Sequence, residues 1–211
     1  MSHQTELQKY AVPSFTFFQK NRFQRGRRLP RKHRSVKRMQ YTDTYRSPLG
    51  GITLAGTEEA LTGLWFNGQK YYPAALAPER AEKELPVFRL TKKWLDLYFQ
   101  GKIPDFTPPL RPMGSAFRLS VWEILKRIPY GEVTTYGAIA RQIAARNQIE
   151  SMSAQAVGGA VAHNPISILI PCHRVVGSGG SLTGYAGGID KKLYLLKLEK
   201  VDTTKFTIPA K

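Results

Sequence analysis

The 211-residue chain contains a single cysteine, Cys172, and only four histidines. One thiol excludes an intramolecular disulfide and any metal site that is built from several cysteines. No apolar run approaches the ~18–20 residues that cross a bilayer, so a membrane span is not expected. The first residues, Met1 to Glu6, lack the apolar core of a secretory signal. Because a lone thiol also suits a reducing compartment, we expect a cytoplasmic protein without membrane attachment.

Acidic residues are scarce as well: 15 Asp and Glu stand against 32 Lys and Arg, which gives a formal net charge of +17. Residues 1–38 hold eleven basic residues and one acidic residue, and the other 21 basic and 14 acidic residues leave a smaller surplus. A positive charge of this size favours a polyanionic partner, of which nucleic acid is the commonest. For residues 1–38, a solvated tail without a partner is an equal alternative.

Four segments are expected along the chain. Residues 1–38 lack a sustained period and are predicted to be a basic, disordered extension. Residues 39–110 are predicted to form a small α+β domain, residues 111–200 a second, mainly helical domain, and residues 201–211 a C-terminal tail. In the first domain, alternating patterns and turn residues predict strands at Tyr41–Tyr45, Ile52–Leu54 and Leu64–Phe66, and a helix from Phe88 to Gln100.

Helical periods dominate the second domain. One helix is predicted from Ala116 to Arg127, ahead of a proline. Thr134 or Thr135 can cap a second helix, and Ser153 can cap a third that runs from Ala154 to His163. Two short helices in succession suggest a helix-turn-helix. The loop between them is longer than the usual tight turn, so a helical pair without DNA binding is the alternative.

Cys172 follows the apolar, strand-like run Ile166–Ile170 and a proline, and it precedes His173 and Arg174. A thiol is a strong nucleophile only as thiolate, and a neighbouring imidazole or cation favours that form. A buried, inert cysteine is the alternative, because free cysteines usually behave as small hydrophobes. His173 and Arg174 both need polar partners, and the glycine-rich stretch 177–188 follows at once. These neighbours favour a reactive thiol.

The surrounding motifs occur in a specific order. They are Phe117, Val121-Trp122, Ile128-Pro129-Tyr130-Gly131-Glu132-Val133, Tyr136, Asn164-Pro165, Ile170-Pro171-Cys172-His173-Arg174-Val175-Val176, Thr183-Gly184-Tyr185-Ala186-Gly187-Gly188 and Leu195-Leu196-Lys197-Leu198-Glu199. In this order they resemble the O6-alkylguanine-DNA alkyltransferases, also called methylated-DNA–protein-cysteine methyltransferases. The resemblance covers about residues 39–200 and is strongest after Gly114.

The resemblance implies an α+β fold: a small N-terminal α/β region with an antiparallel sheet, then a mostly helical C-terminal domain with a winged-helix-like helix-turn-helix. It also implies a monomeric DNA repair protein that flips O6-alkylguanine out of duplex DNA and moves the alkyl group irreversibly to Cys172. Each molecule would act once, with no cofactor and no metal. The sequence leaves open which alkyl groups are accepted and whether O4-methylthymine is a substrate.

Glu199 lies on the same predicted helix face as the inward-pointing Leu195 and Leu196, where a carboxylate needs a partner. A last-turn glutamate in solvent is the alternative. Together with Cys172 and His173 it fits a nucleophile, a base and an orienting group. The resemblance implies these three roles, with His173 drawing the thiol proton through a water molecule.

The resemblance also implies a set of substrate and DNA contacts: Tyr136, Gln155, Asn164, Arg174, Val175 and Tyr185. Tyr136 would crowd the phosphate of the flipped nucleotide and donate to the guanine ring, and Tyr185 would line the pocket. The Val175 carbonyl would accept from the exocyclic amine, and Asn164 would tie the recognition helix to the thiol segment. Two positions depart from the family. Gln155 replaces a common arginine that fills the gap of the flipped base, and Ala186 replaces a serine found in some members.

Three other functions compete with this hypothesis. The first is a non-catalytic sensor of alkyl lesions, as in alkyltransferase-like proteins, which carry tryptophan where this chain has Cys172. The second is a helix-turn-helix regulator, which explains the charge but not the Cys-His-Glu set. The third is a thiol hydrolase, which would have no use for a recognition helix.

Overall fold

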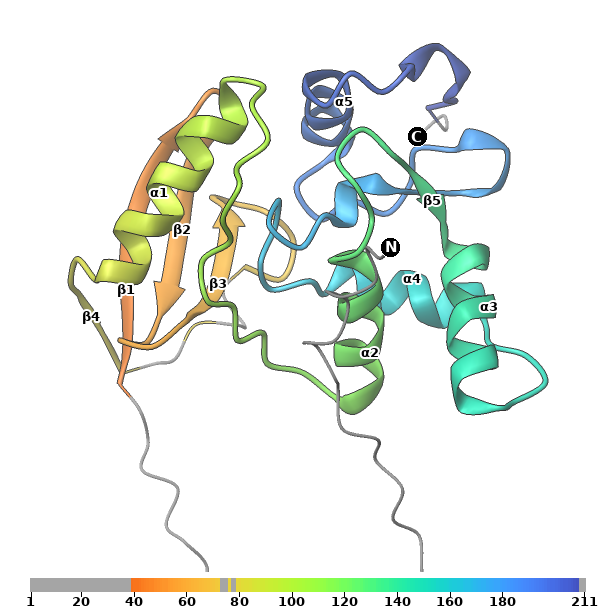
Figure 1. Cartoon of the computed structure of the whole chain (residues 1–211), viewed down its shortest axis with the longest axis horizontal. Coiled ribbons are helices and arrows are strands. Elements are labelled where there is room, and N and C mark those ends of the chain that lie inside the picture. The colour runs from red at the N-terminus through yellow and green to blue at the C-terminus, as the bar shows by residue number, and fades with distance from the viewer. Residues whose placement is uncertain (1–38, 73–75, 77–78, 209–211) are drawn as a thin grey trace, which may run out of the picture. The chain divides into compact units, whose positions relative to one another are not determined.

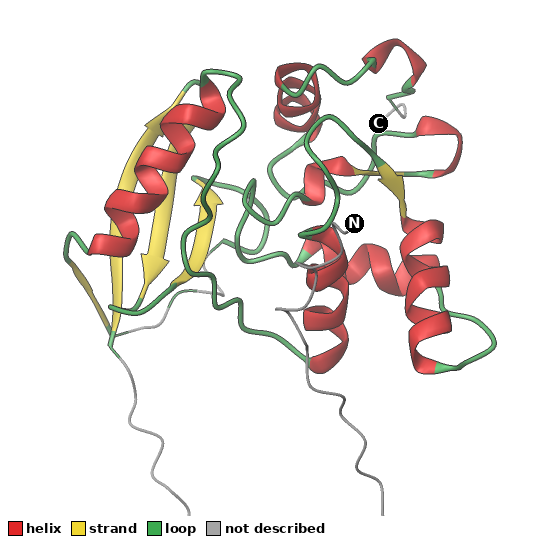
Figure 2. Ribbon diagram, viewed as in Figure 1, coloured by secondary structure: helices red, strands yellow, loops and turns green. Residues whose placement is uncertain are grey.

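The computed structural model describes residues 39–72, 76 and 79–208, and the predicted basic extension 1–38 lies outside them. The first part is a four-stranded sheet in the order β3-β2-β1-β4, with α1 lying along one of its faces (Figures 1 and 2). Its elements are β1 (Gln40–Ser47), β2 (Gly50–Gly56), β3 (Leu61–Phe66), β4 (Arg80–Glu82) and α1 (Pro86–Phe99). The three predicted strands are thus observed. The short β4, which pairs parallel to β1 at the sheet edge, had no predicted counterpart.

Strands β1 to β3 form an antiparallel meander because tight turns join them. Gly50 has a φ of +101°, a conformation that side chains disfavour, and it closes the β1–β2 turn, where its carbonyl accepts from the Ser47 hydroxyl. Every residue of β3 is buried. Its outer edge is covered by the segment before Cys172: the Leu64 N–H donates to the Pro165 carbonyl at 2.9 Å, and the Ser167 N–H donates to the Leu64 carbonyl at 2.9 Å. The sheet therefore supports the thiol segment directly.

Helix α1 begins with Pro86 at its first turn and ends before Gly101, as proline and glycine preferences predict. Its buried face includes Trp94, Leu95 and Tyr98. Trp94 and Tyr98, one turn apart, stack at 5.2 Å between ring centroids. These residues belong to one hydrophobic core that also contains Cys172, so the helix packs into the neighbourhood of the thiol.

The second part is mainly helical and carries a two-stranded sheet in which β5 pairs parallel to β6. Its elements are α2 (Ala116–Leu125), β5 (Thr134–Thr135), α3 (Tyr136–Asn147), α4 (Ala154–Ala162), the 3-10 helix η2 (Cys172–Arg174), β6 (Val175–Val176), η3 (Ser178–Gly180), α5 (Ile189–Leu198) and η4 (Thr203–Lys205). This mixed architecture agrees with the α+β fold expected from the sequence. No helix of the described residues is long and apolar enough to cross a membrane.

The helix caps follow the sequence closely. Ser115, Thr135 and Ser153 each accept a hydrogen bond from a backbone N–H of the first turn of α2, α3 and α4, respectively. Helix α3 ends at Gln148 in the left-handed conformation. The Trp122 indole N–H donates to the Ala160 carbonyl at 2.9 Å and ties α2 to α4. Helix α2 therefore packs against both helices of the pair α3–α4.

The run Ile166–Ile170 was expected to be a strand, and this was wrong. It is a series of turns with a single bridge from Ile166 to Leu64, and Ile168 has a φ of +68°. The side chain of Asn164 satisfies the backbone instead, since it accepts from the Ile166 N–H and donates to the Ile170 carbonyl. The apolar residues of this run thus indicate that the segment is buried, and they do not indicate that it is extended.

The predicted tail beyond residue 200 lies against the glycine-rich segment. The Leu182 N–H donates to the Thr207 carbonyl at 2.9 Å, and the Thr207 N–H donates to the Gly180 carbonyl at 3.1 Å. Residues up to 208 therefore support the loop between η3 and α5.

Candidate active site

Cys172 is the first residue of η2 and is 5% exposed. The Nδ2 atom of Asn164, which directly follows the C-cap of α4, lies 3.1 Å from its sulfur. The same amide nitrogen donates to the Ile170 carbonyl at 2.7 Å. Asn164 therefore joins the end of α4 to the thiol segment.

Burial raises the pKa of the Cys172 thiol above its ordinary value, although the Asn164 amide and the nearby Lys192 ammonium act to lower it. The groups that favour the thiolate are thus Asn164 and Lys192, not the side chains of His173 and Arg174 as expected, and desolvation outweighs them. The thiol is therefore protonated at neutral pH, and its use as a nucleophile requires a base.

Glu199, the C-cap residue of α5, is fully buried and is the centre of a hydrogen-bond network. Its Oε1 atom lies 2.7 Å from His173 Nε2 and accepts from the Tyr98 hydroxyl at 2.7 Å. Arg174 donates to both carboxylate oxygens, from Nη2 at 2.9 Å and from Nε at 2.8 Å. Burial acts to raise the pKa of Glu199, but the partners His173 and Arg174 outweigh it and lower that pKa to about 2. Glu199 is thus a stable carboxylate.

His173 presents its two ring nitrogens to different surroundings. Nε2 faces the ionised carboxylate of Glu199 and is therefore the protonated nitrogen. Nδ1 is buried and has no partner among the described residues. Burial lowers the pKa of His173, so the imidazole is neutral and Nδ1 carries a free lone pair. This tautomer is the one that can accept a proton.

Arg174 was predicted to contact substrate or DNA. The structure places its side chain on the inner side of η2, where it is engaged by Glu199 and donates from Nη1 to the Ile128 carbonyl at 2.6 Å. The residue is 8% exposed, so little of its guanidinium is left for a phosphate. Its observed contacts stabilise the buried carboxylate.

Tyr136 opens helix α3, and its hydroxyl donates to the Thr183 carbonyl at 3.0 Å. The buried Lys192 of α5 donates to the same carbonyl at 2.9 Å and to the Val175 carbonyl at 2.5 Å. The Val175 carbonyl thus accepts from Lys192, and a carbonyl oxygen has a second lone pair with which it can accept from an amine. Desolvation lowers the pKa of Lys192 to about 8. This network joins β6, the glycine-rich loop and α3.

Tyr185 lies on the glycine-rich loop, and its ring is nearly perpendicular to that of His173, at 6.5 Å between centroids. Its hydroxyl is buried and has no hydrogen-bond partner among the described residues. A buried polar atom without a partner is unfavourable, and two such atoms, Tyr185 Oη and His173 Nδ1, come from residues in ring contact. Ligand atoms or water would satisfy both.

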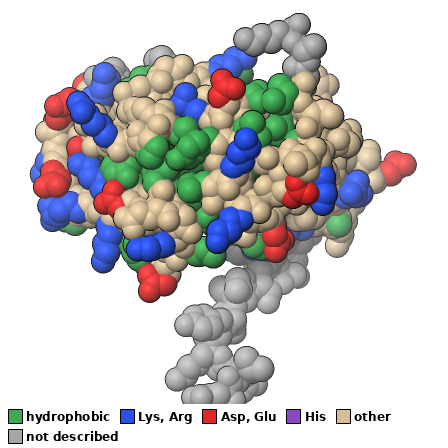
Figure 3. All heavy atoms as spheres, turned by 90° about the horizontal axis from the view of Figure 1, so that it is seen from above, with side chains coloured by type: hydrophobic (Ala, Val, Ile, Leu, Met, Phe, Trp, Pro, Cys, Tyr) green, Lys and Arg blue, Asp and Glu red, His purple; other side chains and the backbone are tan. Residues whose placement is uncertain are grey.

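Gln155 is exposed near the start of α4, whose exposed positions are occupied by small, uncharged residues. Helix α4 itself therefore carries no positive charge. Figure 3 shows one face of the molecule, on which Lys and Arg side chains are spread around an apolar area together with acidic ones. Attraction to phosphates consequently depends on basic residues outside α4.

Sequence reasoning did not identify Tyr98 or Lys192 as site residues. The i,i+4 spacing of Trp94 and Tyr98 is typical of core packing, and the Tyr98 ring does pack in the core. Lys192 had one available signal: it lies one turn before the inward residues Leu195 and Leu196, and a lysine on an apolar face needs polar partners.

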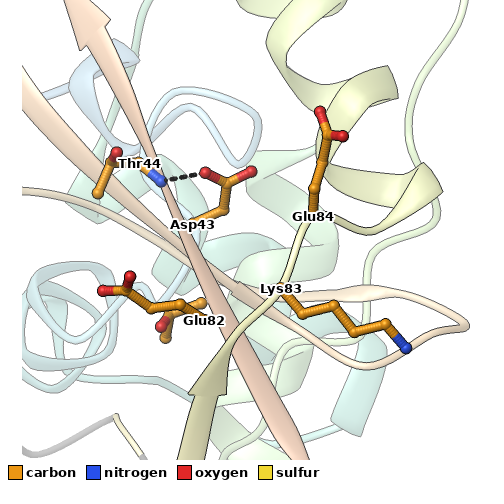
Figure 4. A pocket seen from close by; sticks show the side chains of 6 residues that line it. Asp43, Thr44, Glu82, Lys83 and Glu84 are labelled. Atoms are coloured by element: carbon orange, nitrogen blue, oxygen red, sulfur yellow. Dashed lines mark hydrogen bonds between the residues drawn. The ribbon is translucent and has the colours of Figure 1, made fainter.

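A separate hollow of 340 Å³ lies on the sheet, between β1 and the residues after β4 (Figure 4). It is lined by Thr42, Asp43, Thr44, Glu82, Lys83 and Glu84. Three of these side chains are acidic, and Asp43 is paired with Lys92 at 2.7 Å. Acidic side chains repel phosphates, so the Cys172 region is the better candidate for the functional site.

Two family models match this chain. Residues 116–201 match the family model of the 6-O-methylguanine DNA methyltransferase DNA binding domain. Residues 40–112 match the 6-O-methylguanine DNA methyltransferase ribonuclease-like domain. The chain is 40% identical to a methylated-DNA–protein-cysteine methyltransferase of Haemophilus influenzae over 163 residues, which are 76% of this chain and 87% of that protein. A relative of the same name from Methanosarcina barkeri is 45% identical over 161 residues, 76% of this chain and 97% of its own.

Among solved structures, Mycobacterium tuberculosis OGT in complex with DNA is similar at a TM-score of 0.67 and 39% identity. The match covers 79% of this chain and 94% of that one.

Proposed function

The chain belongs to the 6-O-methylguanine DNA methyltransferase family, and we propose that it repairs DNA by transferring the alkyl group of O6-alkylguanine to Cys172. The observation that carries the proposal is the buried set of Cys172, His173 and Glu199, in which Glu199 lies 2.7 Å from His173 Nε2 and leaves Nδ1 free. The relatives' names specify a protein cysteine as acceptor, and this chain has one cysteine.

The chemistry starts with the thiol proton. His173 Nδ1 takes this proton, directly or through water, and Glu199 stabilises the resulting imidazolium. The thiolate then attacks the alkyl carbon from the side opposite the guanine oxygen. A carbon–sulfur bond forms, the carbon–oxygen bond breaks, and its electron pair passes to the guanine. Because the thioether is chemically stable, each molecule acts once.

The leaving guanine needs a hydrogen-bond donor at its ring. Desolvation raises the pKa of Tyr136 to about 12, so its hydroxyl keeps its proton at neutral pH. It would turn from the Thr183 carbonyl toward the base. The second lone pair of the Val175 carbonyl would accept from the exocyclic amine, and the Tyr185 hydroxyl, which has no partner among the described residues, would gain one in the pocket.

Cys172 is nearly buried, whereas the substrate atom is stacked inside a duplex. The damaged nucleotide must therefore leave the stack and enter the pocket, and unstacking costs a few kcal/mol. The helix pair α3–α4 would bind the duplex, and Gln155 would occupy the gap of the flipped base. Because its substrate is DNA, the protein would act in the cytoplasm, in association with the nucleoid.

Mass spectrometry after incubation with a duplex that contains one O6-methylguanine tests the proposal. We expect one added methyl on the peptide that carries Cys172, and none with unmodified DNA. Cys172→Ala should bind the duplex and gain no methyl. DNA binding by the unaltered protein without methylation of Cys172 would contradict transfer and favour a lesion sensor.

A further inference from the structure

Tyr98 brings a hydroxyl group from the N-terminal sheet domain to the buried carboxylate of the C-terminal domain. It lies on α1, is fully buried, and donates to Glu199 Oε1 at 2.7 Å, across 101 residues of sequence. Its oxygen is also 3.4 Å from His173 Nε2. The ring is held between Trp94, stacked at 5.2 Å, and Tyr130, edge-on at 6.1 Å. The hydroxyl therefore has a fixed direction.

Both carboxylate oxygens of Glu199 accept hydrogen bonds from several groups. Oε1 is within hydrogen-bond distance of His173 Nε2, Tyr98 Oη and Arg174 Nη2, and Oε2 accepts from Arg174 Nε and the Gly131 N–H. Three groups thus share the single oxygen that faces His173. Each donor to a carboxylate spreads its charge and weakens it as an acceptor for the others.

We propose that Tyr98 is a positioning residue for alkyl transfer: its hydroxyl holds Glu199 Oε1 and limits the charge offered to His173, so that His173 stays neutral and can accept the thiol proton. This inference rests on the proposed function, in which His173 is the base. Glu199 alone would favour a permanently protonated imidazole, which cannot act as a base. Tyr98 and Arg174 together balance that attraction.

The charged and titratable groups around His173 come from several elements: Glu199 and Lys192 from α5 and its end, Arg174 and Cys172 from η2, Tyr98 from α1, and Tyr185 from the glycine-rich loop. Among these groups Glu199 favours the imidazolium, whereas burial, Arg174 and Lys192 oppose it. Burial raises the pKa of Tyr98 well above 10, and it therefore remains a donor throughout the working pH range. Without the Tyr98 hydroxyl, Glu199 Oε1 would keep only His173 and Arg174 as hydrogen-bond partners.

The experiment measures single-turnover methyl transfer from O6-methylguanine duplex at pH 5 to 9, at saturating protein. In Tyr98→Phe the ring and its stacking are kept. We expect the acidic limb of the pH–rate profile to move to higher pH by about one unit, because His173 now holds its proton more tightly. The rate on the alkaline plateau should stay within about threefold, and duplex affinity should not change.

Tyr130→Phe is the matched control, since it removes a neighbouring hydroxyl that donates to the Leu198 carbonyl instead of to Glu199. Its acidic limb should coincide with that of the unaltered protein. A limb that does not move in Tyr98→Phe, or a loss of rate that is equal at every pH, would overturn the proposal while methyl transfer itself stands. Absence of transfer in the unaltered protein would instead overturn the proposed function.

Should Tyr98→Phe fail to fold, 3-fluorotyrosine at position 98 provides a second variant. Fluorine makes the hydroxyl a stronger donor, so the acidic limb should move in the opposite direction, to lower pH. An unchanged limb with this residue would contradict the proposed role of Tyr98.

Discussion

The amide nitrogen of Asn164 lies 3.1 Å from the sulfur of Cys172 and donates to the Ile170 carbonyl at 2.7 Å. One side chain thus fixes the turn before the nucleophile and supplies a donor to the sulfur. A donor at this place favours the thiolate that forms during transfer. Asn164 therefore couples the local fold to the chemistry.

Asn164→Ala should lower both the stability of the fold and the reactivity of the Cys172 thiol. The Ile166 N–H and the Ile170 carbonyl would lose buried partners, so the free energy of unfolding in urea should fall by about 3 kcal/mol. The pH dependence of Cys172 alkylation by a small haloacetamide should shift to higher pH. Ser167→Ala, in the same turn, removes only a contact to Gln69 and should leave thiol reactivity unchanged. Equal thiol reactivity in both variants would contradict the role of the amide.

Glu199 predicts an acid-dependent loss of stability. Although burial opposes it, its partners His173 and Arg174 lower its pKa to about 2, below its usual value in the unfolded chain. Its stabilisation is therefore complete above about pH 4.5 and is lost as the pH falls toward 2, by up to about 3 kcal/mol. Urea unfolding at pH 6 and pH 3 should show a larger decrease for the unaltered protein than for Glu199→Gln, which cannot titrate. Parallel decreases would contradict this assignment.

Gly184 and Gly179 form a matched pair, since both have positive φ values, +75° and +68°. A Cβ at Gly184 would lie 2.7 Å from the Tyr136 hydroxyl, whereas a Cβ at Gly179 would meet open space. Both alanine variants should lose about 1 kcal/mol from backbone strain. Only Gly184→Ala should also slow methyl transfer, because it displaces Tyr136. Stability by thermal unfolding and single-turnover rates separate the two effects.

Gln155→Arg should strengthen DNA binding. Gln155 is exposed on α4, which carries no charge, so an arginine there adds one phosphate or base contact. The slope of log K against log salt should become steeper by about one unit, and the free energy of unfolding should change by less than about 0.5 kcal/mol. Fluorescence anisotropy with labelled duplex measures the slope. Gln100→Arg, at the exposed end of α1, is the control and should leave the slope unchanged.

Local features of the fold could be predicted because they depend on neighbours in sequence. Ser115, Thr135 and Ser153 cap helices since a side-chain oxygen reaches an N–H two or three residues onward. The alternation in β1 and the glycine after α1 are equally local. The run Ile166–Ile170 was wrongly predicted as a strand because it is apolar and buried beside β3, whereas its turns depend on the side chain of Asn164.

The sequence by itself determined the reactive elements: one cysteine beside a histidine, a glutamate on an inward helix face, and a glycine-rich loop. Tertiary structure alone decided how these groups are charged. Tyr98 meets Glu199 across 101 residues, Arg174 turns inward to the same carboxylate, and Lys192 reaches two buried carbonyls. The proton affinity of a group depends on its burial and on the donors within about 3 Å, and only the packing of α1 and α5 around η2 brings those donors together.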